Sequence, residues 1–303
     1  MNNLKKKFSI AGYYSAYLIM FSTFMGALFT VFLKNLTDEL NISTIAFFRF
    51  FFGLLIISPF IIKSKFKVLH TNNFKLYLFR SGLNLVGMLM YITAIGIMTL
   101  EKNAALGFII PLYATILAVI ILKEKIKIYR TVALIIGFIG VLIVIQPGLN
   151  TFEKGVIFAL IGNFCVALGM IVVKKISKED TSFTILSYLY IFSTLYTFII
   201  YIFFWQIPDL RQIIILLIAA VLGTLGHYSF TQAIKISEVT FIAPFNYFAL
   251  IWSSLFGYII FKEIPNTLTW IGGSIIFISI MIITLREHNL KKDIIKKSII
   301  NHL

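Results

Sequence analysis

The sequence predicts an all-α polytopic membrane protein with ten transmembrane helices. Hydrophobic residues make up 59% of the 303 residues, and they fall in long continuous runs. A helix of about 20 apolar residues matches the hydrocarbon core of a bilayer, whereas the strands of a transmembrane barrel would alternate apolar and polar residues. No soluble fold of this length could bury so much apolar surface, so lipid must cover part of it.

Ten apolar segments follow one another along the chain, and each is predicted to be one helix. Only short loops join them, so no extramembrane domain is expected to carry separate chemistry. The expected helices are 11–33, 41–62, 76–97, 102–122, 128–146, 155–173, 182–205, 212–234, 239–261 and 267–285.

The positive charges predict the orientation. About 20 of the 27 Lys and Arg residues lie on one side of the predicted helices and about five on the other. Because cytoplasmic loops are enriched in Lys and Arg, both termini are predicted to be cytoplasmic, in a multi-pass protein of the bacterial inner (plasma) membrane. Orientation therefore explains the net charge of +15, and no nucleic-acid partner is expected.

Two stretches of the chain resemble each other. Residues 94–124 begin AIGIMTLEKNAALGF and end ILKE, while residues 233–263 begin AIKISEVTFIAPF and end IFKE. If each repeat contains five helices, an odd number, the second copy would enter the membrane from the side opposite to the first. Inverted repeats of this kind can open a central site to either side in turn, which is the structural basis of alternating access.

Several motifs, in their order and spacing, resemble those of one transporter superfamily. They are IAFFRFFFGLL, FRSGLNLVGMLMYITAIG, LEKNAALGFIIPLYATILAVIILKEK and GFIGVLIVIQPG, in the second to fifth helices. The chain resembles the drug/metabolite transporter superfamily, in its ten-helix EamA-type branch. The resemblance implies two inverted five-helix repeats around a central cavity, which we expect at 8–147 and 153–286. A basic cytoplasmic tail, 287–303, would follow.

The helix expected at 212–234 carries the best stripe of candidate substrate-binding residues. Thr224, His227, Tyr228 and Thr231 fall on one helical face, and polar residues inside a membrane usually face a cavity or one another. His227 either hydrogen-bonds a neighbouring helix as a neutral imidazole or contacts substrate or protons.

Other candidates come from polar and aromatic side chains inside the remaining helices. Each has a structural alternative, such as a hydrogen bond that joins two helices or a place in an interfacial aromatic belt. Arg80 lies near the membrane–water interface in the predicted third helix, and its side chain is expected to extend toward that interface. The further substrate-binding candidates are Asn84, Tyr91, Asn163, Asn246, Tyr247 and Trp252.

Arg49 lies inside the second helix with no acidic residue deep in any predicted span. It could meet backbone carbonyls, pair with Glu101 at a helix end, or hold an anionic group of a substrate. Because the superfamily often has an arginine in this motif, the structural alternative is favoured. All 12 Asp and Glu residues lie in loops, tails or helix ends, which argues for an exchanger or facilitator rather than a carboxylate-coupled carrier.

These observations predict that the protein is a metabolite carrier that works by alternating access. Zinc-protease, G-x-S-x-G and His/Cys cluster motifs are missing from the predicted spans, so no catalytic residue, metal or cofactor is expected. A passive channel and an intramembrane enzyme are the alternatives. The second and third helices resemble those of S-adenosylmethionine carriers, and an amino-acid-like substrate is the other candidate. A homodimer is left open.

Overall fold

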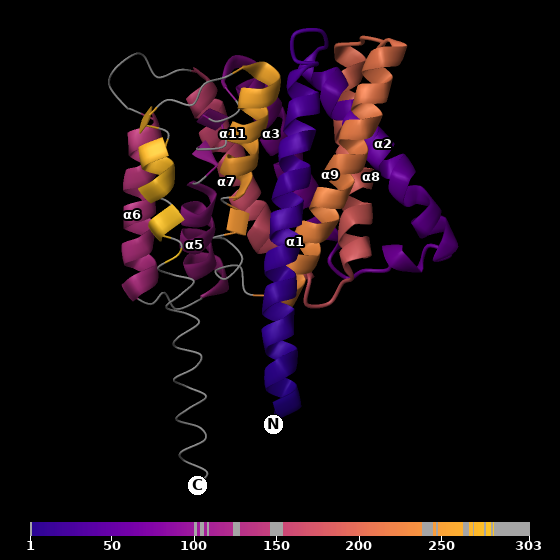
Figure 1. The fold of residues 1–303 in the computed structure, drawn as a ribbon. Helices are drawn as coiled ribbons and strands as arrows, with labels where there is room; N and C mark the ends of the chain where they lie inside the picture. Colours follow the sequence, from indigo (N-terminus) through magenta and orange to yellow (C-terminus); the bar gives the residue numbers. More distant parts are fainter. Residues whose placement is uncertain are drawn as a thin grey trace.

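The computed structural model describes a bundle of helices that stand side by side, with α2 crossing its neighbours at an angle (Figure 1). It describes residues 2–99, 102–103, 106–107, 109–123, 128–145, 154–237, 245–246, 248–262, 267–268, 270–275, 277–279 and 281. Within these ranges every regular element is helical, as the sequence predicts.

Six helices are long and apolar enough to cross a membrane, among the residues described. They are α1 (Asn2–Lys34), α2 (Ile42–Lys63), α3 (Phe74–Ile97), α7 (Lys154–Ile176), α8 (Ser182–Phe203) and α9 (Leu210–Ile236). Most of their ends lie within a few residues of those predicted. The exception is α1, which begins at Asn2 rather than at residue 11, because lysines favour a helix although they are not apolar.

The remaining helices are shorter. They are η1 (Lys67–Leu69), α5 (Ile109–Leu122), α6 (Ile128–Ile145) and α11 (Phe248–Phe261), and Trp270–Ser279 is a further short apolar helix. Pro111 stands in the first turn of α5, where a missing backbone N–H breaks no helical hydrogen bond. The carbonyl of Gly107, four residues before the proline, accepts from the Ile110 N–H instead, at 3.0 Å.

The helix bounds recur along the chain. Helices α2 and α8 both have 22 residues and begin 140 positions apart, and α5 and α11 both have 14 residues and begin 139 positions apart. The residues after α5 and α11, Lys123 and Lys262, both adopt a left-handed conformation, with φ of 55° and 57°. A left-handed residue after the last turn is a common way to end a helix.

Polar contacts at the helix ends recur in the same way. Lys34 at the end of α1 donates to the Met98 carbonyl after α3, at 3.1 Å, and Lys174 in α7 donates to the Ser237 carbonyl after α9, at 3.0 Å. Met98 and Ser237 also share an extended backbone conformation. The contact of α1 with the end of α3 therefore corresponds to that of α7 with the end of α9.

Glycines let the helices that form the core approach closely. At Gly226 of α9 a Cβ would lie 3.4 Å from the Ser22 carbonyl of α1, and at Gly87 of α3 a Cβ would lie 3.6 Å from the Gly162 carbonyl of α7. Small residues are typical of such tight contacts between membrane helices. Helix α1 thus packs on α9 as α3 packs on α7, while α2 packs on α8 and α9.

Large apolar side chains face outward along the spans. On α8, Leu195, Ile199 and Ile202 are each about half exposed, at 52%, 52% and 50%. Exposed apolar surface of this extent along membrane-length helices is what contact with lipid requires. The chain is a multi-pass membrane protein.

Candidate functional site

A buried arginine lies where α1, α2, α8 and α9 meet. Arg49 of α2 is only 3% exposed, and its guanidinium carbon lies 4.7 Å from the ring centroid of Phe29 and 4.4 Å from that of Phe50. Gly223 of α9 leaves room for the charged group, since a Cβ there would lie 3.3 Å from Nη2. The two aromatic rings attract the cation and partly replace its lost hydration.

His227 of α9 is the hydrogen-bond partner of this arginine. Nη2 of Arg49 lies 3.0 Å from Nε2 of His227. An arginine side chain can only donate, so Nε2 of His227 must accept and the ring proton must be on Nδ1. The contact therefore needs a neutral imidazole, which cannot balance the charge of Arg49.

The charge of Arg49 is not balanced by a carboxylate among the residues described. Its Nε and Nη1 atoms are buried and have no hydrogen-bond partner there. A buried donor without an acceptor is costly, and the more so when it carries charge. The arrangement is therefore chemically suited to accept an anionic group or a strong acceptor.

Four hydroxyl groups surround this pair. Tyr190 of α8 meets Thr224 of α9, oxygen to oxygen at 2.8 Å, and Tyr91 of α3 is hydrogen-bonded to Thr30 of α1. Tyr190 also packs edge-on against the Phe50 ring, and Thr30 directly follows Phe29, so both hydroxyl pairs adjoin the rings that lie against the guanidinium group. We refer to the set as the central cluster: Thr30, Arg49, Tyr91, Tyr190, Thr224 and His227.

Three of the predicted substrate-binding residues belong to the central cluster: Tyr91, Thr224 and His227. The other two members of the predicted stripe on α9 lie apart from it. Tyr228 accepts a hydrogen bond from Gln232 at 2.9 Å and packs against the Phe183 ring of α8. Thr231 is 1% exposed, and its hydroxyl has no hydrogen-bond partner among the described residues.

The predicted asparagines inside the spans join helices. Asn84 of α3 donates to the Ser193 hydroxyl of α8 at 3.3 Å, and Asn163 of α7 donates to the Leu106 carbonyl at 2.9 Å. Both contacts match the structural alternative, a hydrogen bond between two helices.

The last predicted candidates lie near α11. Trp252 packs edge-on against Phe24 of α1, with ring centroids 5.1 Å apart, and its Nε1 is buried without a partner in the described part of the chain. Asn246 lies in the short described segment 245–246, and Tyr247 lies outside the described residues.

The structure corrects the expectation for Arg80. Its side chain does not extend to the interface but is 7% exposed and donates from Nη1 to the Ile185 carbonyl of α8, at 2.9 Å. Phe29, Thr30 and Tyr190 were not among the residues predicted from the sequence. The sequence pattern could have indicated Thr30, because Thr23, Gly26 and Thr30 share one face of α1. No such pattern marks Tyr190, which is one of several aromatic residues in its helix.

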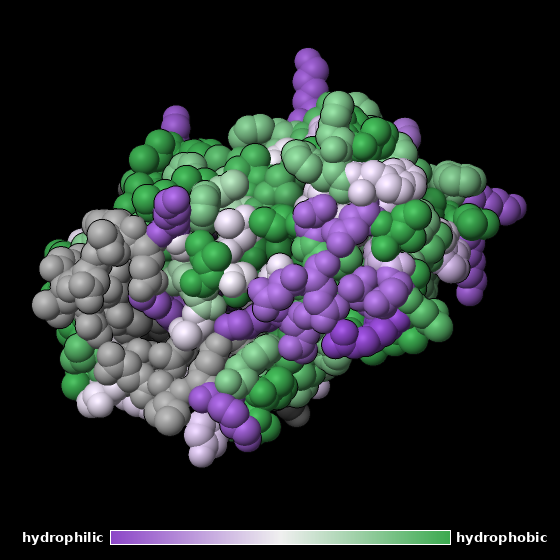
Figure 2. All heavy atoms as spheres, turned by 90° about the horizontal axis from the view of Figure 1, so that it is seen from above, coloured by the Kyte–Doolittle hydropathy of each residue, from purple (hydrophilic) through white to green (hydrophobic). Residues whose placement is uncertain are grey.

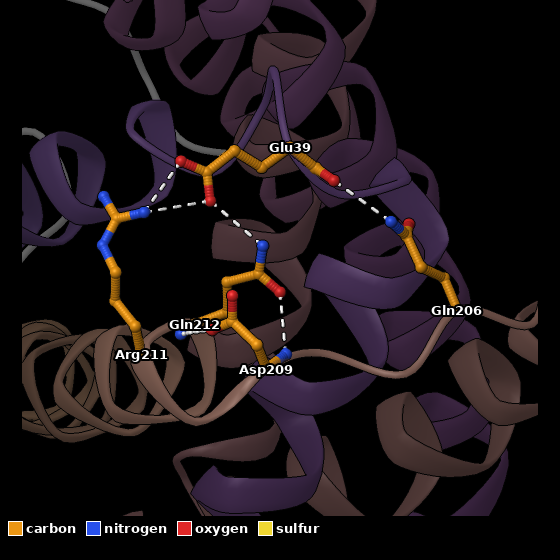
Figure 3. Close-up of polar contacts among 5 residues, drawn as sticks. All are labelled: Glu39, Gln206, Asp209, Arg211 and Gln212. Carbon is orange, nitrogen blue, oxygen red and sulfur yellow. Dashed lines mark hydrogen bonds and ion pairs between the residues drawn. The ribbon is translucent and has the colours of Figure 1, made fainter.

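At one end of the bundle, polar side chains of the α1–α2 loop and of the segment that begins α9 form the Glu39 network, which comprises Glu39, Gln206, Asp209, Arg211 and Gln212 (Figure 3). The Glu39 carboxylate accepts from Arg211 and from Gln212, each at 3.0 Å, and its carbonyl accepts from Gln206 at 3.1 Å. The hydrogen bonds from Gln212 and Arg211 lower the pKa of Glu39. Seen from this end, hydrophilic side chains form a patch between apolar flanks (Figure 2).

The Asp180 network lies at the opposite end of α9. The Asp180 carboxylate accepts from Thr71 at 2.7 Å and from the Tyr77 hydroxyl at 2.9 Å. Its backbone carbonyl accepts from Lys235 at 3.3 Å. This network joins the start of α3 to the α7–α8 loop and the end of α9, with the central cluster between it and the Glu39 network.

Comparison with known proteins places this architecture among membrane transporters. A crystal structure superposes with a TM-score of 0.69 at 13% identity, over 94% of this chain and 99% of the other, and so shares the fold. The S-adenosylmethionine uptake transporter of Rickettsia prowazekii is 27% identical over 254 residues, 84% of this chain and 86% of that protein. The riboflavin transporter of Vibrio cholerae is 28% identical over 248 residues, 81% and 83% of the two chains.

The family model of EamA-like transporters matches the chain twice, at residues 14–146 and 153–285. These matches cover most of its length and follow the same order as the recurring helices. The chain therefore belongs to the EamA-like transporter family and is a membrane transporter rather than an enzyme.

Proposed function

We propose that this protein is an inner-membrane carrier of a small organic metabolite that works by alternating access. Its two halves, 8–147 and 153–286, would be inverted repeats of five helices around the central cluster, with both termini in the cytoplasm. The recurring bounds of α2 and α8 and of α5 and α11 support two equivalent halves. The bias of positive charge to one side supports the orientation.

The observation that carries the proposal is the position of the central cluster between two polar networks. The Glu39 network joins the α1–α2 loop, in the first half, to the loop before α9, in the second. The Asp180 network joins Thr71 and Tyr77 of the first half to the α7–α8 loop of the second. Separation of one network while the other holds would open the cluster to one side of the membrane at a time.

S-adenosylmethionine is the first candidate substrate and riboflavin the second. Relatives named for each align over more than four fifths of this chain, and their identities are similar, at 27% and 28%. The central cluster offers aromatic rings, hydroxyls and one cation, which suit an organic molecule with a polar group better than a bare ion.

Transport would proceed by exchange or facilitated movement. Proton- or sodium-coupled carriers usually place a carboxylate within the membrane. In the described spans the central cluster contains an arginine and a neutral histidine instead. A gradient of substrate, or the membrane potential for a charged substrate, would then supply the driving force.

Counterflow in proteoliposomes tests the proposal. Vesicles are preloaded with S-adenosylmethionine, riboflavin or an amino-acid mixture and diluted into a trace of the labelled compound. A carrier accumulates label transiently against its gradient with the matching preload, and protein-free vesicles do not. Equal flux with and without preload would indicate a channel. No flux of any compound, from protein shown to be folded and inserted, would contradict a carrier of these metabolites.

A further inference from the structure

We propose that Arg49 binds a carboxylate group of the transported metabolite, which makes the substrate class carboxylate-bearing organic molecules. This inference rests on the proposed carrier function but concerns binding, which can be measured without transport. It assigns to Arg49 a role in specificity instead of the purely structural role that the sequence favoured.

The first argument is the unbalanced charge. Arg49 is 3% exposed, its Nε and Nη1 atoms have no partner among the described residues, and the histidine on Nη2 is neutral. A guanidinium group in an apolar region is stable only when a counter-charge or several strong acceptors meet it. An incoming carboxylate would supply both, because its two oxygens can accept from the fork of N–H groups.

The second argument is the direction from which a ligand can approach. The rings of Phe29 and Phe50 lie against the guanidinium as cation–π partners, so they do not use its N–H groups. His227 holds Nη2 from α9. The N–H groups of Nε and Nη1 remain without a partner among the described residues, and they point outward in the plane of the guanidinium group. Donors in this plane are the ones that recognise a planar carboxylate.

The third argument is the position of Arg49 along the bundle. Its partner His227 on α9 lies between Gln212 of the Glu39 network and Lys235 of the Asp180 network. Gly223 lets α9 pack closely against the other side of the guanidinium group, since a Cβ there would lie 3.3 Å from Nη2 and 3.4 Å from the Phe29 ring. Arg49 thus lies between the Glu39 and Asp180 networks, at the depth where a carrier needs its substrate site.

A phosphate group is the less suitable anion. Phosphate sites usually combine several donors such as backbone N–H groups, lysines and arginines. The described part of the central cluster offers one cation and several hydroxyl groups, which match a single negative charge.

The test compares two ligands that differ by one group. S-adenosylmethionine and decarboxylated S-adenosylmethionine share the nucleoside and the sulfonium, and only the first carries a carboxylate. Binding to the full-length protein in detergent is measured as the ligand-dependent rise in unfolding temperature. We expect the decarboxylated compound to bind about tenfold more weakly or worse in the wild type, as for the loss of one charged hydrogen-bonded contact.

Arg49→Gln should abolish this preference by weakening S-adenosylmethionine and leaving the decarboxylated compound nearly unchanged. Arg49→Lys should restore part of it, because the charge remains and the planar fork is lost. Arg80→Gln is the matched control, since it also removes a buried arginine but one that is bonded to the Ile185 carbonyl. It should lower stability without changing the ratio of the two affinities.

Each outcome is decisive. Equal binding of the two compounds by the wild type would overturn the inference, and so would a preference that survives Arg49→Gln. Stabilisation by riboflavin alone, which has no carboxylate, would overturn it while leaving the proposed carrier intact, and no stabilisation by any compound would also count against it. A carboxylate preference without counterflow would support the site and contradict the carrier.

Discussion

Nη2 of Arg49 lies 3.0 Å from Nε2 of His227, a contact that joins residues 178 positions apart on α2 and α9. The pair connects the second helix of the first half to the third helix of the second half. Because arginine donates the hydrogen bond, the contact persists only while His227 is neutral at Nε2. The stability of the bundle and the state of the central cluster are therefore linked through one side chain.

His227→Ala should destabilise the protein by about 1–3 kcal/mol, because it leaves one more N–H of a buried guanidinium without an acceptor. His227→Gln retains an acceptor and should lose less. Thermal unfolding in detergent measures both, and counterflow should fall with His227→Ala.

The neighbouring variant Tyr228→Phe is the control for His227. It removes only the hydrogen bond from Gln232 and should change stability by less than about 1 kcal/mol. Equal losses for His227→Ala and Tyr228→Phe would contradict the importance of the contact with Arg49.

Gly53→Ala should disturb the central cluster through Tyr190. A Cβ at Gly53 of α2 would lie 2.1 Å from Cε1 of Tyr190, so the ring must move and its bond to Thr224 must stretch. Overpacking of this kind costs about 1–3 kcal/mol. Gly169→Ala in α7, where a Cβ would meet nothing within 4 Å, should be neutral or stabilise the helix by up to about 1 kcal/mol. Unfolding temperatures that fall equally would refute the packing argument.

The contribution of Glu39 to stability should depend on pH. The hydrogen bonds from Gln212 and Arg211 hold the pKa of Glu39 below its usual value of 4.5. The folded protein therefore binds this proton more weakly than the unfolded chain, so the stabilisation is fully present above that usual value. It is lost as pH falls through the lowered pKa.

Unfolding temperatures of the wild type and Glu39→Gln, measured from pH 7 downward, test this. The difference between the two proteins should be constant near neutral pH and shrink below about pH 4.5. A difference that stays the same down to pH 3, or that grows on acidification, would contradict it.

Asp180→Ala should lower the stability of the protein more than the removal of any single residue that donates a hydrogen bond to Asp180. The carboxylate accepts from both Thr71 and Tyr77, and hydrogen bonds to charged groups are worth about 1.5–3 kcal/mol each. Tyr77→Phe removes one donor and should cost less than Asp180→Ala in the same thermal unfolding experiment. If Tyr77→Phe were as harmful, packing of the tyrosine ring rather than the network would explain the effect.

The positions of the helices could be read from the amino-acid order because lipid imposes a length on each apolar run. The expected second, third and seventh helices end within two residues of α2, α3 and α8. The matching Lys-Glu pairs at 123–124 and 262–263 also marked the recurrence, and the two lysines adopt the same left-handed conformation. The family resemblance is confirmed by the family model.

The central cluster could not be read in this way, because helical periodicity defines a face but not the helix that it meets. His227 and Tyr228 both belonged to the predicted stripe, yet His227 meets Arg49 of α2 and Tyr228 meets Phe183 of α8. The placement of α9 against both α2 and α8 decides this difference.

By itself, the sequence determined that the chain is an all-helical membrane protein with a repeated order of helices, since hydrophobic run length and the pattern of lysines suffice for that. Only the tertiary structure decided that Arg49, alone in its helix, would meet His227 and two phenylalanine rings without a carboxylate among the described residues. The physical reason is that close packing at Gly223 and Gly226 sets how α9 lies against α1 and α2, and no local pattern records that contact.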